Sequence, residues 1–200
     1  TINLSWTAPA ADASRQAVFV FDERAGRLDV WDRAQGMLNF VSPVGVALGA
    51  NGEVLVSDAE LGYVVRLAAD GTPAGTVGAG QLRRPTGLAR DAKTGRLFVA
   101  DTQAHSVKVF DDRGALLQAI GERGENAGQF NYPTYLSLAH GELYVTDSIN
   151  ARVQVFDAHS GEYRRTIGAR GMFFGNLVRP KGIAVDGERN VYVIESYYDN

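Results

Sequence analysis

Five acidic residues at one repeated position are the first candidates for chemistry in this sequence. Each ends a short apolar run, and they are Asp22, Asp58, Asp101, Asp147 and Glu195. Carboxylates gathered in a ring could bind a metal ion such as Ca²⁺, which prefers oxygen ligands. A carboxylate at the end of a strand can instead accept hydrogen bonds from the backbone amides of the next loop. Because the acid keeps its place in every repeat, the sequence favours this structural role.

Other catalytic or metal-binding sets are poorly supported by the residue types. The chain has no cysteine, so a zinc site would need histidine, and the candidates are His105, His140 and His159. We expect all three to be exposed turn residues. No serine stands in a Gly-x-Ser-x-Gly elbow, and the glycines do not form a phosphate-binding loop. We therefore expect no catalytic residues, no cofactor and no metal site.

The segments that must position these residues recur along the chain. Three joints resemble one another, and a fourth, which ends at Pro43, keeps their last five positions; the three are Gly80–Pro85, Gly128–Pro133 and Gly175–Pro180. The four prolines lie 42 (43 to 85), 48 (85 to 133) and 47 (133 to 180) residues apart. A period of this size between β-type segments is typical of a propeller blade.

Each repeat reads as four short strands. A strand follows the proline, a second ends on the acid, and a third and fourth follow; the third repeat has Thr134–Ser137, Leu143–Asp147, Val153–Asp157 and a run to Ile167. Apolar and polar residues alternate between Gly, Asp and Asn turns, which indicates strands rather than helices. The sequence therefore predicts an all-β propeller of four-stranded blades, with about four to five blades present.

The repeat resembles the NHL family. The matching segments are the Gly128-Gln-Phe-x-x-Pro133 joint, the Pro180-x-Gly-Ile-Ala184 strand, the Tyr144-Val-x-Asp147 strand and the run Asn150–Asp157. The resemblance implies six blades, which need about 270 residues, so we expect the C-terminal blades to be truncated or absent. We expect residues 1–15 to be an N-terminal strand (Ile2–Trp6) and linker, and 16–200 to be the propeller.

The resemblance also bears on enzymatic function. Zinc lyases with NHL-type blades bind the metal through histidines directly after the blade proline, where this chain has Val44, Thr86, Thr134 and Lys181. Related calcium-dependent lactonase-like hydrolases use acids and amides that converge on the axis, and the sequence isolates no such set. We expect a protein that is not an enzyme, and a hydrolase or lyase with a metal in the central channel is the first alternative.

Two sister loops differ in a way that suggests a binding surface. The loop before one joint reads Gly121-Glu-Arg-Gly-Glu-Asn-Ala-Gly128, and its counterpart reads Gly168-Ala-Arg-Gly-Met-Phe-Phe-Gly175. Exposed Met and Phe side chains favour an interface, although they could also fold back onto the blade. The predicted partner-binding residues are Arg170, Met172, Phe173, Phe174 and Arg179. A second hypothesis places Lys181, Tyr197, Tyr198 and Asp199 at the rim of the central channel.

The net charge and the family resemblance indicate the kind of partner and the location of the protein. Lysine and arginine total 20 against 23 acids, a formal net charge of −3, so nucleic acid is not the expected partner. We expect a protein-interaction scaffold; an RNA-binding platform, as in some NHL proteins, is the second alternative. The resemblance to exported bacterial propellers implies an extracytoplasmic, envelope-associated complex subunit. No apolar run could span a membrane, and a lipid anchor upstream of residue 1 fits this setting.

Overall fold

The computed structural model describes residues 17–22, 27–32, 40–173 and 175–196, and these form strands joined by tight turns, with two 3-10 turns at Ala50–Gly52 and Thr102–Ala104. The strands are β1 (Ala17–Asp22), β2 (Arg27–Asp32), β3 (Pro43–Leu48), β4 (Val54–Asp58), β5 (Tyr63–Leu67), β6 (Pro73–Val77), β7 (Pro85–Arg90), β8 (Leu97–Asp101), β9 (Ser106–Phe110), β10 (Leu116–Ile120), β11 (Pro133–Ala139), β12 (Glu142–Asp147), β13 (Arg152–Asp157), β14 (Tyr163–Ile167), β15 (Pro180–Val185) and β16 (Val191–Glu195). Within these ranges no helix is long and apolar enough to cross a membrane.

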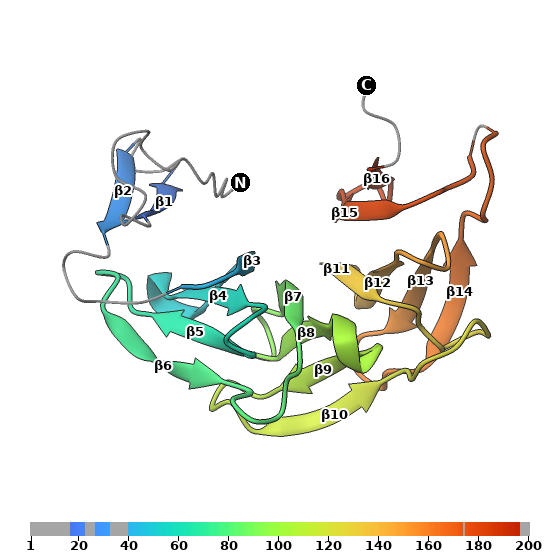
Figure 1. Cartoon of the computed structure of the whole chain (residues 1–200). Coiled ribbons are helices and arrows are strands. Elements are labelled where there is room, and N and C mark those ends of the chain that lie inside the picture. The colour runs from blue at the N-terminus through green and yellow to red at the C-terminus, as the bar shows by residue number, and fades with distance from the viewer. Residues whose placement is uncertain (1–16, 23–26, 33–39, 174, 197–200) are drawn as a thin grey trace.

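The strands form separate antiparallel sheets that follow one another around an arc (Figure 1). Three sheets have four strands each, β3–β6, β7–β10 and β11–β14, and β1–β2 and β15–β16 form two-stranded sheets. This arrangement confirms the predicted all-β propeller blades. The expected strand Ile2–Trp6 and the linker at residues 7–14 lie outside the described residues.

The inner strands of neighbouring sheets approach closely. β3, β7, β11 and β15 lie side by side in that order, and each has a bulge directly after its proline. A Cβ atom on Gly87 would lie 2.5 Å from the carbonyl oxygen of Thr134 in the next sheet, and one on Gly45 would lie 2.2 Å from that of Thr86. Glycine at these positions therefore permits the backbone contact between sheets.

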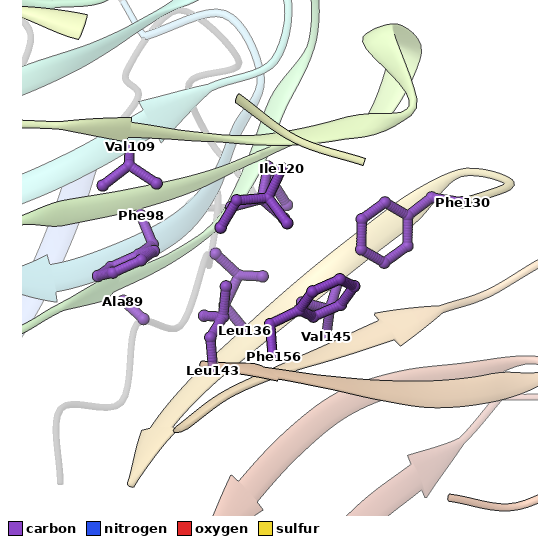
Figure 2. Close-up of a cluster of buried hydrophobic side chains, with 11 residues drawn as sticks. Ala89, Phe98, Val109, Ile120, Phe130, Leu136, Leu143, Val145 and Phe156 are labelled. Atoms are coloured by element: carbon purple, nitrogen blue, oxygen red, sulfur yellow. The ribbon is translucent and has the colours of Figure 1, made fainter. Parts of the chain in front are cut away.

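The hydrophobic core lies between the sheets rather than within any one of them. Ala89, Phe98 and Val109 of one sheet face Leu143 and Phe156 of the next, and Phe130 closes the cluster (Figure 2). A second cluster of the same kind joins the β3–β6 and β7–β10 sheets. Each sheet thus depends on its neighbours for burial, as expected of a repeat architecture.

Buried hydroxyl groups add hydrogen bonds between sheets near the inner strands. Thr86 Oγ1 donates to the carbonyl oxygen of Thr134 at 2.8 Å, Thr102 Oγ1 to that of Pro133 at 2.7 Å, and Ser148 Oγ to that of Pro180 at 2.7 Å. These hydroxyls satisfy carbonyl groups that the bulges leave outside the strand ladder.

The pairing of strands separates two faces of the molecule. Pro133 lies opposite Asp147, so the joint that precedes an inner strand is at the same end as the loop between the second and third strands. We call this end the joint face; it comprises residues 41–42, 59–62, 78–84, 102–105, 121–132, 148–151, 168–173 and 175–179. The opposite end, formed by the turns at 49–53, 68–72, 91–96, 111–115, 140–141, 158–162 and 186–190, is the turn face.

Candidate partner-binding face

The repeated acids organise the backbone of the joint face. Asp101 is buried, and its carboxylate accepts the backbone N–H groups of Arg83 and Arg84 at 2.9–3.1 Å. Asp58 and Glu195 accept joint amides in the same way, for example from Ser42 and Arg179. The predicted structural role is therefore confirmed, with a correction. The acids bind the joint that precedes the inner strand, and Asp58, Asp147 and Glu195 also accept donors from the loop that follows the acid.

This arrangement leaves the acids without the geometry of a metal site. The oxygens of Asp58, Asp101, Asp147 and Glu195 accept hydrogen bonds from backbone amides, and Asp147 also from neighbouring side chains. Across the described ranges no three His, Asp or Glu side chains are grouped so that they could hold a metal ion.

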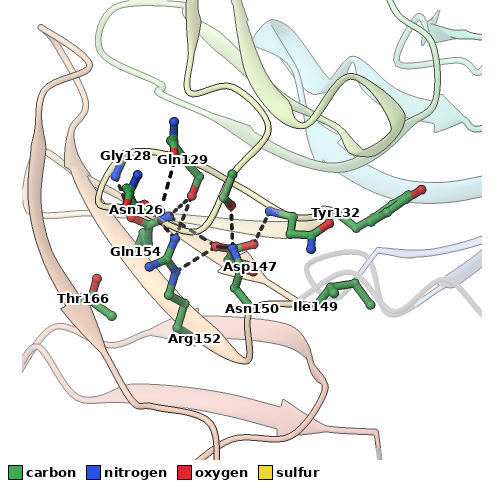
Figure 3. A network of polar contacts seen from close by, with 12 residues as sticks. Asn126, Gly128, Gln129, Tyr132, Asp147, Ile149, Asn150, Arg152, Gln154 and Thr166 are labelled. Carbon is green, nitrogen blue, oxygen red and sulfur yellow. Dashed lines mark hydrogen bonds and ion pairs between the residues drawn. The ribbon is translucent and has the colours of Figure 1, made fainter.

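Asp147 is the centre of the most extensive polar network on the joint face (Figure 3). Its carboxylate accepts the N–H of Asn131 at 2.7 Å, Asn150 Nδ2 at 2.8 Å and Arg152 Nε at 2.9 Å. Burial raises the pKa of Asp147, although these hydrogen bonds act in the opposite direction. Every donor around the buried carboxylate comes from its own blade, so the network stiffens this part of the joint face.

The same network fastens the loop 121–128. Arg152 Nη2 donates to the carbonyl oxygens of Asn126 and Gln129, each at 2.8 Å, and Asn150 Nδ2 donates to that of Gly124 at 2.9 Å. Gln154 Oε1 accepts the N–H of Gly128 at 2.9 Å. The polar side chains of this loop therefore lie over a backbone that β13 holds in place.

The sister loop presents apolar side chains to solvent instead. Met172 is 74% exposed and Phe173 is 85% exposed, so neither folds back onto the blade. The turn around them is closed by two backbone hydrogen bonds, from Asn176 N–H to the Phe173 carbonyl at 2.9 Å and from Gly171 N–H to the Leu177 carbonyl at 3.1 Å. Phe174 lies outside the described residues.

Two further exposed apolar side chains lie on the joint face, in the blade that precedes this loop. Ile149 and Tyr132 are 40% and 45% exposed. Backbone hydrogen bonds link the two segments: Ser148 N–H donates to the Tyr132 carbonyl at 3.3 Å, and Ile149 N–H donates to the Asn131 carbonyl at 3.1 Å. Arg170 Nη2 donates to the Ile149 carbonyl and thereby connects the Met172 loop to this pair. We call Tyr132, Ile149, Met172 and Phe173 the apolar strip.

The position of His105 corrects a sequence-based expectation. We expected an exposed turn residue, but His105 is buried under the next joint. Its Nδ1 accepts the Tyr132 N–H at 3.3 Å, and its ring meets the Tyr132 ring edge-on with 4.6 Å between centroids. The loop between β8 and β9 packs against the following joint, which explains the burial. His140 and His159 are exposed on the turn face, as predicted.

The remaining predicted site residues are placed as follows. Arg170 and Arg179 are exposed on the joint face, next to the joint that leads into β15. Lys181 is the second residue of the inner strand β15 and is half-buried. Tyr197, Tyr198 and Asp199 lie outside the described residues, so the channel-rim hypothesis stays a prediction.

Sequence reasoning missed Tyr132 and Ile149, although a signal was present. The residue before the blade proline is Ser42, Arg84, Tyr132 or Arg179, and only the third is apolar. The second residue after the blade acid is Arg24, Glu60, Gln103, Ile149 or Tyr197, and Ile149 is the one aliphatic residue among them. Comparing every position between sister loops would have found both.

Comparison with known proteins identifies the repeat. The model of the NHL repeat matches residues 82–110, and a model described as 6-bladed beta-propeller matches residues 129–199. The human E3 ubiquitin-protein ligase NHLRC1 is 31% identical over 120 residues, which are 60% of this chain and 29% of the ligase.

Two further proteins match over larger parts of this chain. The Xenopus laevis peptidyl-glycine alpha-amidating monooxygenase B is 31% identical over 151 residues, which are 68% of this chain and 17% of that protein. The chain therefore spans less than a third of either curated relative. A chain of the nidogen/laminin complex superposes with a TM-score of 0.73 at 17% identity, covering 90% of this chain and 64% of that chain, which shows a shared fold.

Proposed function

Because this chain is an NHL-repeat β-propeller, we propose that it is a non-catalytic module that binds a protein partner on its joint face. One observation carries the proposal: the exposure of Met172 and Phe173 beside Tyr132 and Ile149. Burying a fully exposed side chain of this kind contributes about 1.5–3 kcal/mol. Two such anchors at the centre of a contact are typical of binding hot spots.

The scaffold beneath part of the strip suits this role. The Asp147 network and the core between the sheets hold the joint that carries Tyr132 and the loop that carries Ile149, so binding there would cost little ordering of the backbone. The acids and hydroxyl groups near the inner strands are engaged in hydrogen bonds within the protein. These contacts support a binding role over a catalytic one for this face.

We further propose that the module works outside the cytoplasm, in an envelope-associated bacterial assembly. The support is the likeness of its repeats to those of exported bacterial propellers. Fractionation of cells that produce the full-length protein would test this: we expect it in the envelope or secreted fraction, and a purely cytoplasmic protein would contradict the proposal.

The binding role is tested by capture from an extract of the source organism. The bait is the wild-type chain or Met172→Glu/Phe173→Asn, which carries the residues of the sister loop. Leu116→Glu/Leu117→Asn is the matched control, since these side chains are 43% and 48% exposed on the outer strand β10. Captured proteins are identified, purified and titrated against each variant.

We expect the joint-face variant to bind at least about tenfold more weakly and the outer-strand variant to bind like the wild type. Urea denaturation checks that both variants remain folded. Equal binding by all three proteins would overturn the proposed face.

A further inference from the structure

Both faces carry arginines with and without an ion pair. On the turn face Arg66, Arg90, Arg164 and Arg165 form ion pairs with Glu53, Asp112, Asp157 and Glu142 at 2.5–2.8 Å. The turn-face arginines Arg96, Arg113 and Arg189 make none in the part of the chain that the structure describes. On the joint face Arg83, Arg123, Arg170 and Arg179 are exposed, and none of them has an acidic partner within the described residues. Four exposed guanidinium groups on one face thus retain their capacity to bind carboxylates.

The acids at the strand ends near these arginines are already engaged. The carboxylates of Asp101 and Asp147 are buried and bind backbone amides, and that of Glu195 binds the amides of Val178 and Arg179. Glu60 lies 3.6 Å from Arg84. Glu122 and Glu125 are exposed in the loop 121–128. On the joint face, five exposed arginines (Arg83, Arg84, Arg123, Arg170 and Arg179) thus stand against three exposed acids (Glu60, Glu122 and Glu125), although the whole chain is acidic.

The positive charges flank the apolar strip on both sides. Arg84, Tyr132 and Arg179 occupy the same position, directly before the proline, in three successive blades whose inner strands lie side by side. Tyr132 is thus bracketed by an arginine in each neighbouring blade. Arg170 is held next to Ile149 by its hydrogen bond to the Ile149 carbonyl. The result is an apolar centre with cationic ends.

We propose that the occupant of the joint face is an acidic–apolar protein segment, in which Leu- or Phe-type side chains cover the strip and flanking Asp or Glu carboxylates bind the arginines. This inference rests on the proposed function and names the chemistry of its partner. Carboxylates fit the forked donors of arginine, and apolar side chains cover Ile149 and Met172. An RNA strand would leave these two aliphatic side chains without a stacking role.

The test is a selection of short random peptides displayed on phage against the immobilised full chain, with a random single-stranded RNA pool selected in parallel. Fluorescence anisotropy then measures the best peptide and a copy in which Gln replaces each Asp and Glu. The proteins are wild type, Arg170→Gln/Arg179→Gln and the control Arg113→Gln/Arg189→Gln. The control removes two exposed arginines from the turn face.

We expect selected peptides to be enriched in Asp and Glu beside apolar residues. The Gln copy should bind about tenfold more weakly, and so should the Arg170/Arg179 variant, from roughly three- to fivefold per ion pair. The turn-face control should bind like the wild type, and added salt should weaken binding.

Four outcomes would overturn the inference. Selected peptides without acidic enrichment, or equal loss in both arginine variants, would remove the role of charge. Tighter selection of RNA than of peptides would assign the face to nucleic acid. Peptides that are apolar but not acidic, and that fail on Met172→Glu/Phe173→Asn, would keep the binding face and refute only its acidic partner.

Discussion

The two sister joints before β11 and β15 share a Gly-x-Arg-Gly frame, yet they differ in how they are held and in which side chains they expose. The first, at residues 121–128, carries small or polar side chains and is fastened by Arg152 and Gln154 of β13 and by Asn150 just before that strand. The second, which leads into β15, has the same set of backbone hydrogen bonds as the first but lifts Met172 and Phe173 into solvent. One frame thus carries fastened polar side chains in one blade and exposed apolar side chains in the next, and under the proposed function the second set serves recognition.

The largest expected difference between the joints is in stability. Asp147→Ala leaves Arg152, Asn150 and the Asn131 amide without their buried acceptor and should cost about 3 kcal/mol. Glu195→Ala removes the equivalent acid beneath the second joint, where the carboxylate is half-buried and binds backbone amides only, and should cost about 1 kcal/mol. Urea denaturation measures both, and equal losses would show that the two joints are fastened alike.

The second prediction concerns transfer of the apolar side chains. Glu125→Met/Asn126→Phe, made in the Met172→Glu/Phe173→Asn background, moves the pair to the first joint. The side chains of Glu125 and Asn126 make no hydrogen bond there, so the fold should tolerate the change. We expect the grafted protein to bind the partner as weakly as the ungrafted double variant, to within about twofold, because binding needs the hot-spot cluster as a whole.

The reason lies in the neighbours that the graft lacks. The sister positions of Tyr132 and Ile149 in the preceding blade are Arg84 and Gln103, which supply no apolar surface. Titration of the captured partner checks this, with the ungrafted double variant as the reference. Full recovery of affinity would mean that two exposed side chains suffice wherever they stand.

Features that depend on local sequence could be predicted, and features that depend on contacts between neighbouring blades could not. The strands, the prolines and the repeated acids follow a local pattern, so the blades could be predicted from the sequence alone. The burial of His105 could not, because it depends on how one loop packs against the joint of the next blade. Whether Met172 and Phe173 face solvent likewise depended on neighbouring backbone, and the sequence left both readings open.

A smaller effect is expected at the edge of the apolar strip. Ile149→Gln installs the residue of the preceding blade and removes a side chain that is 40% exposed. Partner affinity should fall about three- to tenfold, because the variant loses the apolar contact of one aliphatic side chain at the edge of the binding site. Stability should be nearly unchanged. Gln103→Ile is the reciprocal change and should not raise affinity. A gain with Gln103→Ile would extend the strip into the preceding blade.

The smallest expected effect is a difference between Arg165 and Arg170 in how the stability of the protein depends on pH. Arg165 donates to both oxygens of Glu142, and this pairing lowers the pKa of Glu142 from its ordinary 4.5 to about 2. A carboxylate with a depressed pKa in the folded state stabilises the protein above its unfolded pKa, and that contribution is lost as the pH falls from about 4.5 towards 2. Glu142→Gln and Arg165→Gln should therefore both flatten the acid side of the stability profile, measured by urea denaturation across this range. Arg170→Gln should leave the profile unchanged, since Arg170 binds a backbone carbonyl rather than a carboxylate. If Arg170→Gln flattened the profile as well, Arg170 would have an acidic partner within the chain. It would then not be available to the carboxylate of a binding partner.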